Sequence, residues 1–185
     1  MRKGLLFFAE IIKIVIIAAV IVFPIRYFIF QPFLVKGVSM EPTFSNGDYL
    51  IIDEISYRFQ SPKRGEVIVF KYPFNPSNKF IKRIIGLPGE KIEFRNSQII
   101  ITQRFGQQII LKEKEGLKFS QYSLQEKKFV IPENHYFVLG DNCLYSFDSK
   151  NWGALAEKYI IGRVFLRLFP FNKIDYFLKP EHYSF

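Results

Sequence analysis

Cysteine and histidine are scarce in this chain, and their scarcity excludes several kinds of chemistry. Among the 185 residues there is one cysteine, Cys143, so no disulfide can form within the chain. The two histidines are His135 and His182, whereas common zinc sites draw on several His and Cys ligands. No metal site of that kind and no cofactor is therefore expected. With only two histidines, a Ser-His-Asp triad has few candidates for its base, so any hydrolytic chemistry is expected to use another base.

Helical periodicity is also missing after residue 30, and the chain has no internal repeat or low-complexity tract. Short runs rich in Val, Ile, Phe and Tyr alternate with turn signals such as Asn46-Gly47 and Gly86-Leu87-Pro88-Gly89, a pattern typical of β-strands. Domains of many short strands usually close into sandwiches or barrels, because closure protects strand edges. We therefore predict an all-β domain with strands at 49–53, 66–71, 80–85, 91–94, 98–102, 108–112, 127–131, 136–139 and 160–169.

Two stretches carry a more specific expectation. Within 160–169, apolar residues alternate with Arg163 and Arg167, so a regular strand places both arginines on one face and Val164 on the other. The polar stretch 103–125 is predicted to be a protruding hairpin or a flexible insert.

Acidic residues are outnumbered, and this balance bears on the partners of the chain. With 26 Lys and Arg against 17 Asp and Glu, the formal net charge is +9. Such a balance favours an anionic membrane surface or a nucleic acid, and a solvated basic face explains it equally well. The 22 phenylalanines are many for a wholly soluble domain and indicate that part of the surface meets lipid. The length suits one domain plus an anchor.

The N-terminal segment is the longest apolar run of the chain, covering residues 5–30. About 20 apolar residues cross a bilayer, and the run reaches that length if Lys13 and Arg26 extend to opposite interfaces. A cleavable signal peptide is the alternative, but no Ala-x-Ala-like site follows the run. We therefore predict an uncleaved single-pass anchor over 1–32 and a β-rich domain over 33–185. Charge counting leans toward a cytoplasmic N-terminus.

Two segments contain a serine and a lysine that could carry chemistry. The segment 37–43 contains Ser39 between glycine and proline, which by itself is typical of a turn. In 80–89, Lys82 lies between large apolar residues of one strand face, while Arg83 points the other way. Burial lowers the pKa of a lysine, by up to ~3–5 units, and a lysine near neutrality can accept a proton from a serine hydroxyl. The alternative is an edge strand whose lysine reaches solvent.

A third segment, GDNCLYSFDSKNWG at 140–153, is dense in hydrogen-bonding groups and follows an apolar strand. Taken alone it is a polar loop with Asx-type turns. Together with GVSMEPT at 37–43, FIKRIIGLPGE at 80–90 and RGEVIVFKYP at 64–73, it resembles the conserved boxes of the bacterial type I signal peptidases. The boxes occur in the family's order after an apolar anchor, and the similarity runs to about Gly162.

The resemblance implies an antiparallel β-sheet catalytic domain on the outer face of the bacterial cytoplasmic membrane, with the N-terminus cytoplasmic. It implies that Ser39 is the nucleophile and Lys82 the general base of a serine endopeptidase. Such enzymes remove the signal peptides of exported preproteins after small residues at −1 and −3. The implied partners are those signal peptides, the phospholipid membrane and the protein export machinery, with no nucleic acid.

The resemblance also implies supporting roles. Ser146 matches a serine that orients the lysine amine, and Asp148, Asp141 and Asn142 match the family's supporting residues. Six residues match positions that contact the substrate, and an extended peptide is expected to add as a strand beside them: Phe33, Val35, Gly37, Met40, Phe80 and Ile81.

Three residues depart from the pattern. Gly37 stands where some members have a serine that helps to form the oxyanion hole, although other members also carry glycine. Cys143 and Lys150 stand where arginine is common, and a lysine lacks the bidentate fork of an arginine.

Several alternatives stay open. One is an S26-type peptidase dedicated to a conjugation or pilus substrate. Another is an inactive homologue that binds leader peptides, although intact Ser39 and Lys82 argue against it. A cysteine peptidase built on Cys143 and His135 is the least favoured.

Overall fold

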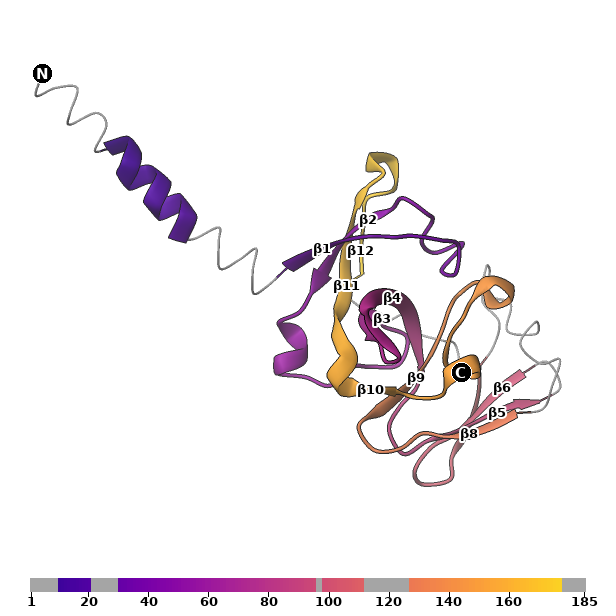
Figure 1. Ribbon diagram of the computed structural model, residues 1–185. Coiled ribbons are helices and arrows are strands. Elements are labelled where there is room, and N and C mark those ends of the chain that lie inside the picture. The colour runs from indigo at the N-terminus through magenta and orange to yellow at the C-terminus, as the bar shows by residue number, and fades with distance from the viewer. Residues whose placement is uncertain (1–9, 21–29, 96–97, 112–126, 178–185) are drawn as a thin grey trace, which may run out of the picture.

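Two antiparallel β-sheets form the domain, and the computed structural model describes residues 10–20, 30–95, 98–111 and 127–177. The larger sheet has the strand order β1-β2-β11-β3-β4-β9-β10, with β12 beside β11 (Figure 1). The smaller sheet has the order β7-β6-β5-β8. Every pairing among the described strands is antiparallel, so the predicted fold class is confirmed for this part of the chain.

The elements are short, as the spacing of turn signals predicts. The larger sheet contains β1 (Phe30–Leu34), β2 (Tyr49–Asp53), β3 (Val67–Tyr72), β4 (Asn75–Gly86), β9 (His135–Leu139), β10 (Leu155–Ala156), β11 (Ile160–Phe169) and β12 (Asp175–Tyr176). The smaller sheet contains β5 (Lys91–Arg95), β6 (Gln98–Thr102), β7 (Gln108–Leu111) and β8 (Lys127–Val130). Single helical turns are η1 (Ser56–Arg58), η3 (Cys143–Tyr145), α2 (Ser149–Trp152), η4 (Glu157–Tyr159) and η5 (Phe171–Lys173).

All nine predicted strands are present, and most begin and end within two residues of the expected bounds. The exception is β4, which begins at Asn75 rather than Phe80 because the hairpin turn from β3 is confined to Pro73 and Phe74. Strand β1 was not among the predicted strands. It contains Pro32, and proline is tolerated in a strand at the edge of a sheet, which is the position of β1.

The predicted sidedness of β11 is wrong after Val164. The pairing with β2 shifts between Val164 and Leu166, so one extra residue is inserted at that point. Such a bulge reverses which face each later side chain occupies. Arg163 therefore lies opposite Asp53 while Arg167 lies opposite Leu50, and the two arginines point to opposite faces of the sheet.

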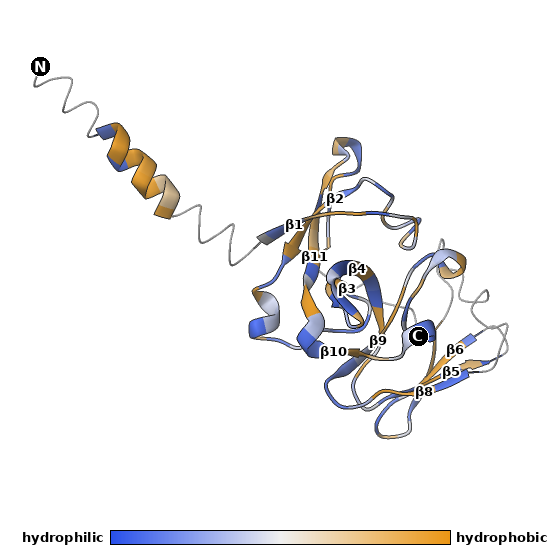
Figure 2. Ribbon diagram, viewed as in Figure 1, coloured by the Kyte–Doolittle hydropathy of each residue, from blue (hydrophilic) through white to orange (hydrophobic). Residues whose placement is uncertain are grey.

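The hydrophobic core contains two clusters of buried residues that hold the strands and the turn after β1 in place. Figure 2 shows hydrophobic residues along the strands of both sheets. The smaller sheet packs its apolar face, including Ile92 and Ile99, against Phe137 of β9. A second cluster of buried residues joins the end of β1, the following turn, β2 and β4, and we call it the turn cluster: Val35, Met40, Phe44, Leu50, Ile52, Val67, Val69, Ile81 and Val164.

The N-terminal segment is helical over 10–20 and extends away from the sheets (Figure 1). Its apolar side chains are exposed. Within the described ranges, no helix is both long and apolar enough to cross a bilayer. The remaining parts of the predicted anchor, 1–9 and 21–29, lie outside the described residues.

The stretch 103–125 is only partly described. Its first part turns between β6 and β7, and these strands pair from Ile99–Leu111 to Thr102–Gln108. Leu111 is buried in the core beside β9, so the hairpin belongs to the smaller sheet. Residues 112–126 lie outside the described residues.

Candidate active site

Ser39 lies in a tight turn that follows β1. The Phe44 N–H donates to the Met40 carbonyl oxygen at 2.8 Å. Gly37 has a φ of +91°, a conformation that glycine adopts without steric cost. Its N–H donates to Asn46 Oδ1 at 2.9 Å. These contacts fix the backbone on both sides of the serine, so its hydroxyl is held in one place.

Lys82 of β4 meets this turn. Its Nζ lies 2.7 Å from Ser39 Oγ and 3.0 Å from the Ile81 carbonyl oxygen. The lysine is 4% exposed, and its Nζ lies 5.7 Å from the centre of the Phe80 ring. The structure thus brings together the two residues that the sequence singled out, with the lysine beside an apolar neighbour of its own strand.

The protonation of Lys82 is shifted by its surroundings. Burial lowers the pKa of its ammonium from 10.5 to about 8, opposed by the charges of Asp148 and Asp141 and aided by that of Lys150. No carboxylate is within hydrogen-bonding distance of Lys82 Nζ among the described residues. The amine therefore has a substantial neutral fraction near pH 8, and the neutral form can accept a proton from a hydroxyl.

Asn142 holds the Ser39 turn from the opposite side. Its N–H donates to the Ser39 carbonyl oxygen at 3.0 Å, and its Nδ2 donates to the Val38 carbonyl oxygen at 3.1 Å. Gly140 permits this approach, because a Cβ there would lie 2.4 Å from the Ser39 carbonyl oxygen and 2.3 Å from Ser146 Oγ. Asn142 therefore positions the turn that carries the serine.

Asp141 forms a buried ion pair with Arg83. The Arg83 Nε donates to Oδ1 at 2.8 Å and its Nη2 donates to Oδ2 at 2.7 Å, and both side chains are almost fully buried. Arg83 also donates to Thr43 Oγ1 at 3.3 Å. A bidentate pair of this kind fixes orientation as well as distance. Arg83 lies opposite Lys82 across β4, as the alternation predicts, and connects the 140–153 loop to the Ser39 turn.

Asp148 is fully buried and caps α2. It accepts the Lys150 N–H at 3.2 Å and the Gly140 N–H at 3.2 Å, so it ties α2 to the end of β9. Lys150 Nζ lies 3.1 Å from Asp148 Oδ2. Burial lowers the pKa of Lys150, and the Asp148 carboxylate opposes that shift. The lysine that replaces the family's arginine thus still pairs with the aspartate.

Ser146 does not make the hydrogen bond that the resemblance implies. Its Oγ is buried and has no hydrogen-bond partner among the described residues. Because the Oγ lies next to Gly140, it is close to the Ser39 turn. Its role in orienting Lys82 stays a prediction.

The cysteine and histidine considered in the sequence occupy structural positions. Cys143 is buried in the core cluster beside Leu139. His135 begins β9, and its Nδ1 lies 2.8 Å from the Glu133 carbonyl oxygen. Within the ranges that the structure describes, no three His, Cys, Asp or Glu side chains gather as metal ligands.

A groove of about 570 Å³ opens beside Ser39 and Lys82. Four of the six residues predicted to contact the substrate line it, namely Phe33, Gly37, Phe80 and Ile81. Val35 and Met40 do not line it: they are 2% and 1% exposed and belong to the turn cluster. Because side chains alternate along an extended chain, Val35 points into the core while its neighbours face the groove. Both residues support the groove from behind.

Eight further residues line the groove without having been predicted, and four of them carry aromatic or charged side chains that bear on the substrate: Tyr145, Phe147, Lys36 and Lys79. Tyr145 and Phe147 are 70% and 52% exposed, and two aromatic residues in an otherwise polar loop were a visible sign of such a role. Lys36 and Lys79 also line the groove. Nothing in their local sequence distinguishes them from other surface lysines.

Two unpaired strand edges border the groove. Strand β1 is at the end of the larger sheet. Strand β4 pairs with β9 only at Arg83, Ile84 and Gly86, so its edge at 79–82 has no partner strand among the described residues. Lys79 Nζ donates to Gln31 Oε1 at 3.1 Å, and this contact joins β4 to β1. Open edges of this kind can accept an extended peptide as an added strand.

Comparison with known proteins gives a consistent family. The sequence pattern of "Signal peptidase, peptidase S26" matches residues 8–169. The chain is 33% identical over 193 residues to signal peptidase IB of Staphylococcus aureus, covering 98% of each chain. It is 36% identical over 174 residues to probable signal peptidase I-1 of Synechocystis, covering 90% of this chain and 85% of that one. The crystal structure of a signal peptidase I from Enterococcus faecalis is 28% identical, with a TM-score of 0.45, and covers 56% of this chain and 97% of that chain.

Proposed function

The chain belongs to peptidase family S26, the signal peptidases, and is a serine peptidase; from that premise we propose that it removes signal peptides from exported preproteins, with Ser39 as nucleophile and Lys82 as general base. The observation that carries the assignment of these residues is the 2.7 Å contact between Ser39 Oγ and the Lys82 amine. Burial supports it, because the lowered pKa of Lys82, about 8, makes the neutral amine available near physiological pH.

The proposed reaction proceeds through an acyl-enzyme. Neutral Lys82 accepts the proton of Ser39 as the serine oxygen attacks the carbonyl carbon of the residue at −1. The peptide C–N bond then breaks, and Lys82 returns the proton to the leaving amine, which becomes the N-terminus of the mature protein. A water molecule, deprotonated by the same amine, attacks the ester. Hydrolysis releases the signal peptide with a new carboxylate and restores Ser39.

The developing oxyanion needs hydrogen-bond donors. The Ser39 N–H donates to none of the described residues and is available for this role. Gly37 offers no side chain, and a Cβ added there would meet no atom within 4 Å, so the space beside it is open to a water molecule or to the substrate. Loss of one oxyanion donor costs ~10²–10³ in rate where nothing replaces it.

The groove suits small side chains at −1 and −3. Phe33, Phe80 and Ile81 line it with large apolar groups, which leave room for little more than Ala, Ser or Gly. Alternate residues of an extended peptide face the same side, so the side chains at −1 and −3 enter the same wall together. This supports a preference for Ala-x-Ala.

The proposal places the reaction at the outer face of the cytoplasmic membrane of a bacterium, with residues 1–32 as the anchor and the export machinery as the source of substrate. An apolar ridge supports this placement. The strand register aligns Leu34, Tyr49 and Phe169 across β1, β2 and β11, and all three are exposed. Phe171 packs edge-on against Phe169, with ring centres 5.4 Å apart. Such aromatic surfaces suit the headgroup region of a bilayer.

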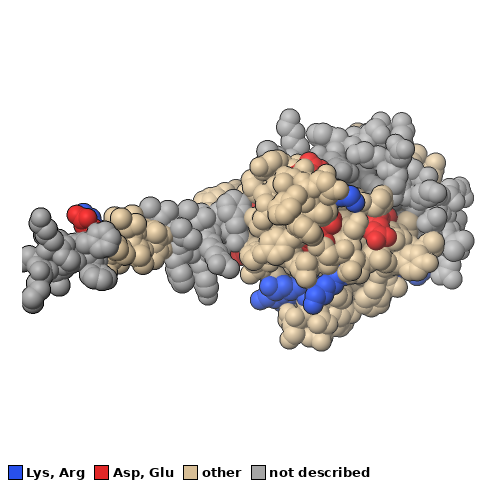
Figure 3. Space-filling model, turned by 90° about the horizontal axis from the view of Figure 1, so that it is seen from above, with Lys and Arg blue, Asp and Glu red and all other residues tan. Residues whose placement is uncertain are grey.

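The ridge reaches the groove, because Leu34 lines both. Figure 3 views the domain from the side that carries the β11–β12 hairpin; most of the described surface there carries neither Lys or Arg nor Asp or Glu, the largest group of Lys and Arg lies at the lower edge, and smaller basic and acidic patches lie elsewhere. A substrate held in the membrane could therefore pass along apolar surface to Ser39.

The test is cleavage of a purified preprotein with an Ala-x-Ala site by the full chain in detergent. We expect wild type to cut at that site, with Ser39→Ala and Lys82→Met inactive. Ser61→Ala and Lys91→Met alter exposed residues outside the groove and are expected to keep wild-type activity. Mass spectrometry of the mature product locates the cut.

Two outcomes contradict the proposal. Cleavage by Lys82→Met rejects the lysine as base. Failure of wild type in both detergent and lipid vesicles leaves a peptidase dedicated to one conjugation or pilus substrate, or an inactive homologue that binds leader peptides.

A further inference from the structure

Positive charge lines the groove without a matching negative charge. Besides Lys82, the lining residues include Lys36 and Lys79 and no aspartate or glutamate among the described residues. Both lysines are exposed and stand on opposite sides, Lys36 after β1 and Lys79 on β4. Glu54 interacts electrostatically with Lys79, and it also interacts with Arg58 and Lys71. The rim of the groove is therefore positively charged.

Lys79 occupies a defined position along the groove. It lies on the unpaired edge of β4, three residues before Lys82, and a strand rises about 3.3 Å per residue. Its backbone is therefore about 10 Å along the strand from that of Lys82. The contact from Lys79 Nζ to Gln31 Oε1, at 3.1 Å, spans from β4 to β1 at this point. A peptide added between the two edges must pass this contact or displace it.

Side chains of a bound peptide divide between the two sides of the groove. If those at −1 and −3 lie on the face of β4 that carries Phe80 and Lys82, those at −2 and −4 lie on the opposite face, which carries Ile81 and Lys79. The spacing of about 10 Å brings the residue at −4 beside Lys79, because three residues separate it from −1. Lys79 is thus the first charged group that the side chain at −4 meets.

We propose that Lys79 is a specificity-determining residue that selects signal peptides by charge at −4, favouring acidic side chains and disfavouring basic ones. The proposal rests on the proposed function, since it requires the signal peptide side of the cleavage site to lie along β4. Lys36 adds to the same field from the opposite rim. Lys79 takes no part in the proton transfers, so its effect is confined to which peptides are accepted.

The experiment compares three preproteins that are identical except for Glu, Gln or Lys at −4. With wild type in detergent at low ionic strength, kcat/KM is expected to fall in the order Glu, Gln, Lys, with about threefold to tenfold between the extremes, as for an exposed ion pair. Salt at about 0.5 M should reduce the difference, because it screens exposed charges. Lys79→Gln should flatten the order and Lys79→Glu should reverse it.

The matched control is Lys71→Glu. Lys71 lies directly opposite Lys79 on β3, is exposed and does not line the groove, so this variant makes the same change of charge nearby. We expect it to keep the wild-type order. Ratios between substrates within one variant are the readout, because any effect of the new charge on Lys82 is common to all three substrates.

The outcomes separate this proposal from the proposed function. If wild type leaves the Gln substrate uncut, the proposed function fails and the selection fails with it. If wild type cuts the Gln substrate but treats Glu and Lys alike, charge selection is overturned while the peptidase activity stands. An order that survives in Lys79→Glu equally overturns the role of Lys79.

Discussion

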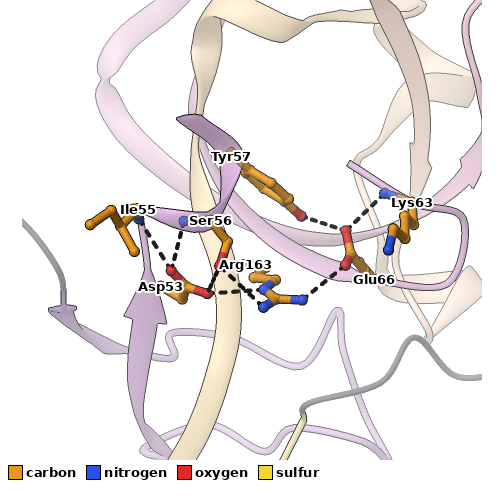
Figure 4. A network of polar contacts seen from close by, with 7 residues as sticks. All are labelled: Asp53, Ile55, Ser56, Tyr57, Lys63, Glu66 and Arg163. Carbon is orange, nitrogen blue, oxygen red and sulfur yellow. Dashed lines mark hydrogen bonds and ion pairs between the residues drawn. The ribbon is translucent and has the colours of Figure 1, made fainter. Parts of the chain in front are cut away.

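Two regions with buried charged side chains, one around Arg163 and one at Ser39 and Lys82, differ in whether each charge has an oppositely charged partner. In the first, which we call the Arg163 network, Arg163 of β11 lies 3.1 Å from Asp53 Oδ2 and 3.3 Å from Glu66 Oε1. Ser56 Oγ donates to Asp53 Oδ2 at 2.5 Å, and Tyr57 OH donates to Glu66 Oε2 at 2.8 Å (Figure 4). Each carboxylate in this network therefore has an opposite charge and further donors.

The pKa shifts in the Arg163 network show that its ionised forms are favoured. Burial alone raises the pKa of Asp53, but hydrogen bonds from Ser56 and Arg163 outweigh burial and hold the pKa below its ordinary value. Burial likewise lowers the pKa of Arg163, and the contacts with Asp53 and Glu66 reverse that shift. The side chains of Asp53 and Arg163 therefore stay ionised, and the network joins β2, β3 and β11.

The Ser39–Lys82 pair has no such compensation. Lys82 contacts a hydroxyl and a carbonyl oxygen, and its pKa falls because burial is not balanced by a carboxylate in contact. The nearby Ser146 Oγ lacks a partner within the described part of the chain. In the Arg163 network, buried charges stabilise the fold because each has an oppositely charged partner and hydrogen bonds. Where partners are left out, burial lowers the pKa of the lysine to about 8, which suits the proposed role of Lys82 as a base and costs some stability.

The largest expected effect comes from breaking the Arg163 network. Arg163→Met leaves the carboxylates of Asp53 and Glu66 buried without their cation, and we expect the free energy of unfolding to fall by about 3–5 kcal/mol. Urea unfolding in detergent, followed by the fluorescence of the single tryptophan, Trp152, measures this loss. The control is Arg104→Met, because the Arg104–Glu133 pair is exposed and should change stability by less than about 1 kcal/mol. Equal losses in both variants would contradict the contrast.

At the candidate active site, removal of the buried cation is expected to raise stability rather than lower it. The pKa of Lys82 is about 8 in the folded state, against 10.5 for an ordinary lysine, so folding disfavours its protonated form. This cost is fully present below pH 8, on the order of 3 kcal/mol, and disappears as pH rises from 8 to 10.5. Lys82→Met should therefore abolish activity yet raise stability at pH 7, less the lost hydrogen bonds.

Measurement of the melting temperature of Lys82→Met and wild type at pH 7 and pH 10 tests this. The gain should shrink at the higher pH. A variant that is less stable than wild type at pH 7 shows that the contact with Ser39 outweighs the cost of burial.

Nine of the strands could be predicted because apolar alternation and turn residues are local signals. The two-residue strands β10 and β12 are too short to carry a pattern, and Pro32 concealed β1. The sequence pattern also misassigned the faces of β11, since the bulge between Val164 and Leu166 depends on pairing with β2. Alternation did separate Lys82 from Arg83 correctly, and Arg83 indeed faces the other way toward Asp141.

The site was harder to predict from the sequence than the fold. The approach of Ser39 to Lys82, 43 positions apart, follows from long-range packing, and only the family resemblance paired them. The same resemblance placed Val35 and Met40 in the groove, where the structure has them in the core. The compensation of Asp53 and Glu66 by Arg163 has no local signature, because the three residues come from three different strands or their ends.

A smaller effect concerns the cation next to the dyad. Lys150 pairs with Asp148, and its charge helps to lower the pKa of Lys82. In the proposed mechanism the rate requires neutral Lys82, so kcat/KM should rise with pH through about 8. In Lys150→Met the lost cation should move this rise to higher pH, whereas Lys150→Arg keeps the charge and should leave it near the wild-type position.

Profiles of kcat/KM against pH for the three proteins measure the shift. If the rise moves equally in Lys150→Arg and Lys150→Met, geometry rather than charge links Lys150 to the dyad. A rise that stays in place in both shows that the field of Lys150 does not reach Lys82.

The smallest effect is a matched pair of serine substitutions. Ser56 Oγ is fully engaged, donating to Asp53 and accepting from Arg163 Nη2 at 3.2 Å, so Ser56→Ala should lower stability by about 1–2 kcal/mol. Ser146 Oγ is buried and has no partner among the residues that the structure describes, so Ser146→Ala removes an unsatisfied group and should leave stability unchanged or slightly higher. Urea unfolding compares the two.

For activity, we expect the reverse order of the two serine variants: Ser146→Ala has the larger effect and Ser56→Ala the smaller. If Ser146 meets the Lys82 amine only when substrate is bound, Ser146→Ala lowers kcat/KM while Ser56→Ala keeps it. A loss of stability in Ser146→Ala as large as that in Ser56→Ala would mean that its hydroxyl has a partner in solution. The site would then be as fully compensated as the Arg163 network, and the lowered pKa of Lys82 would need another cause than incomplete pairing.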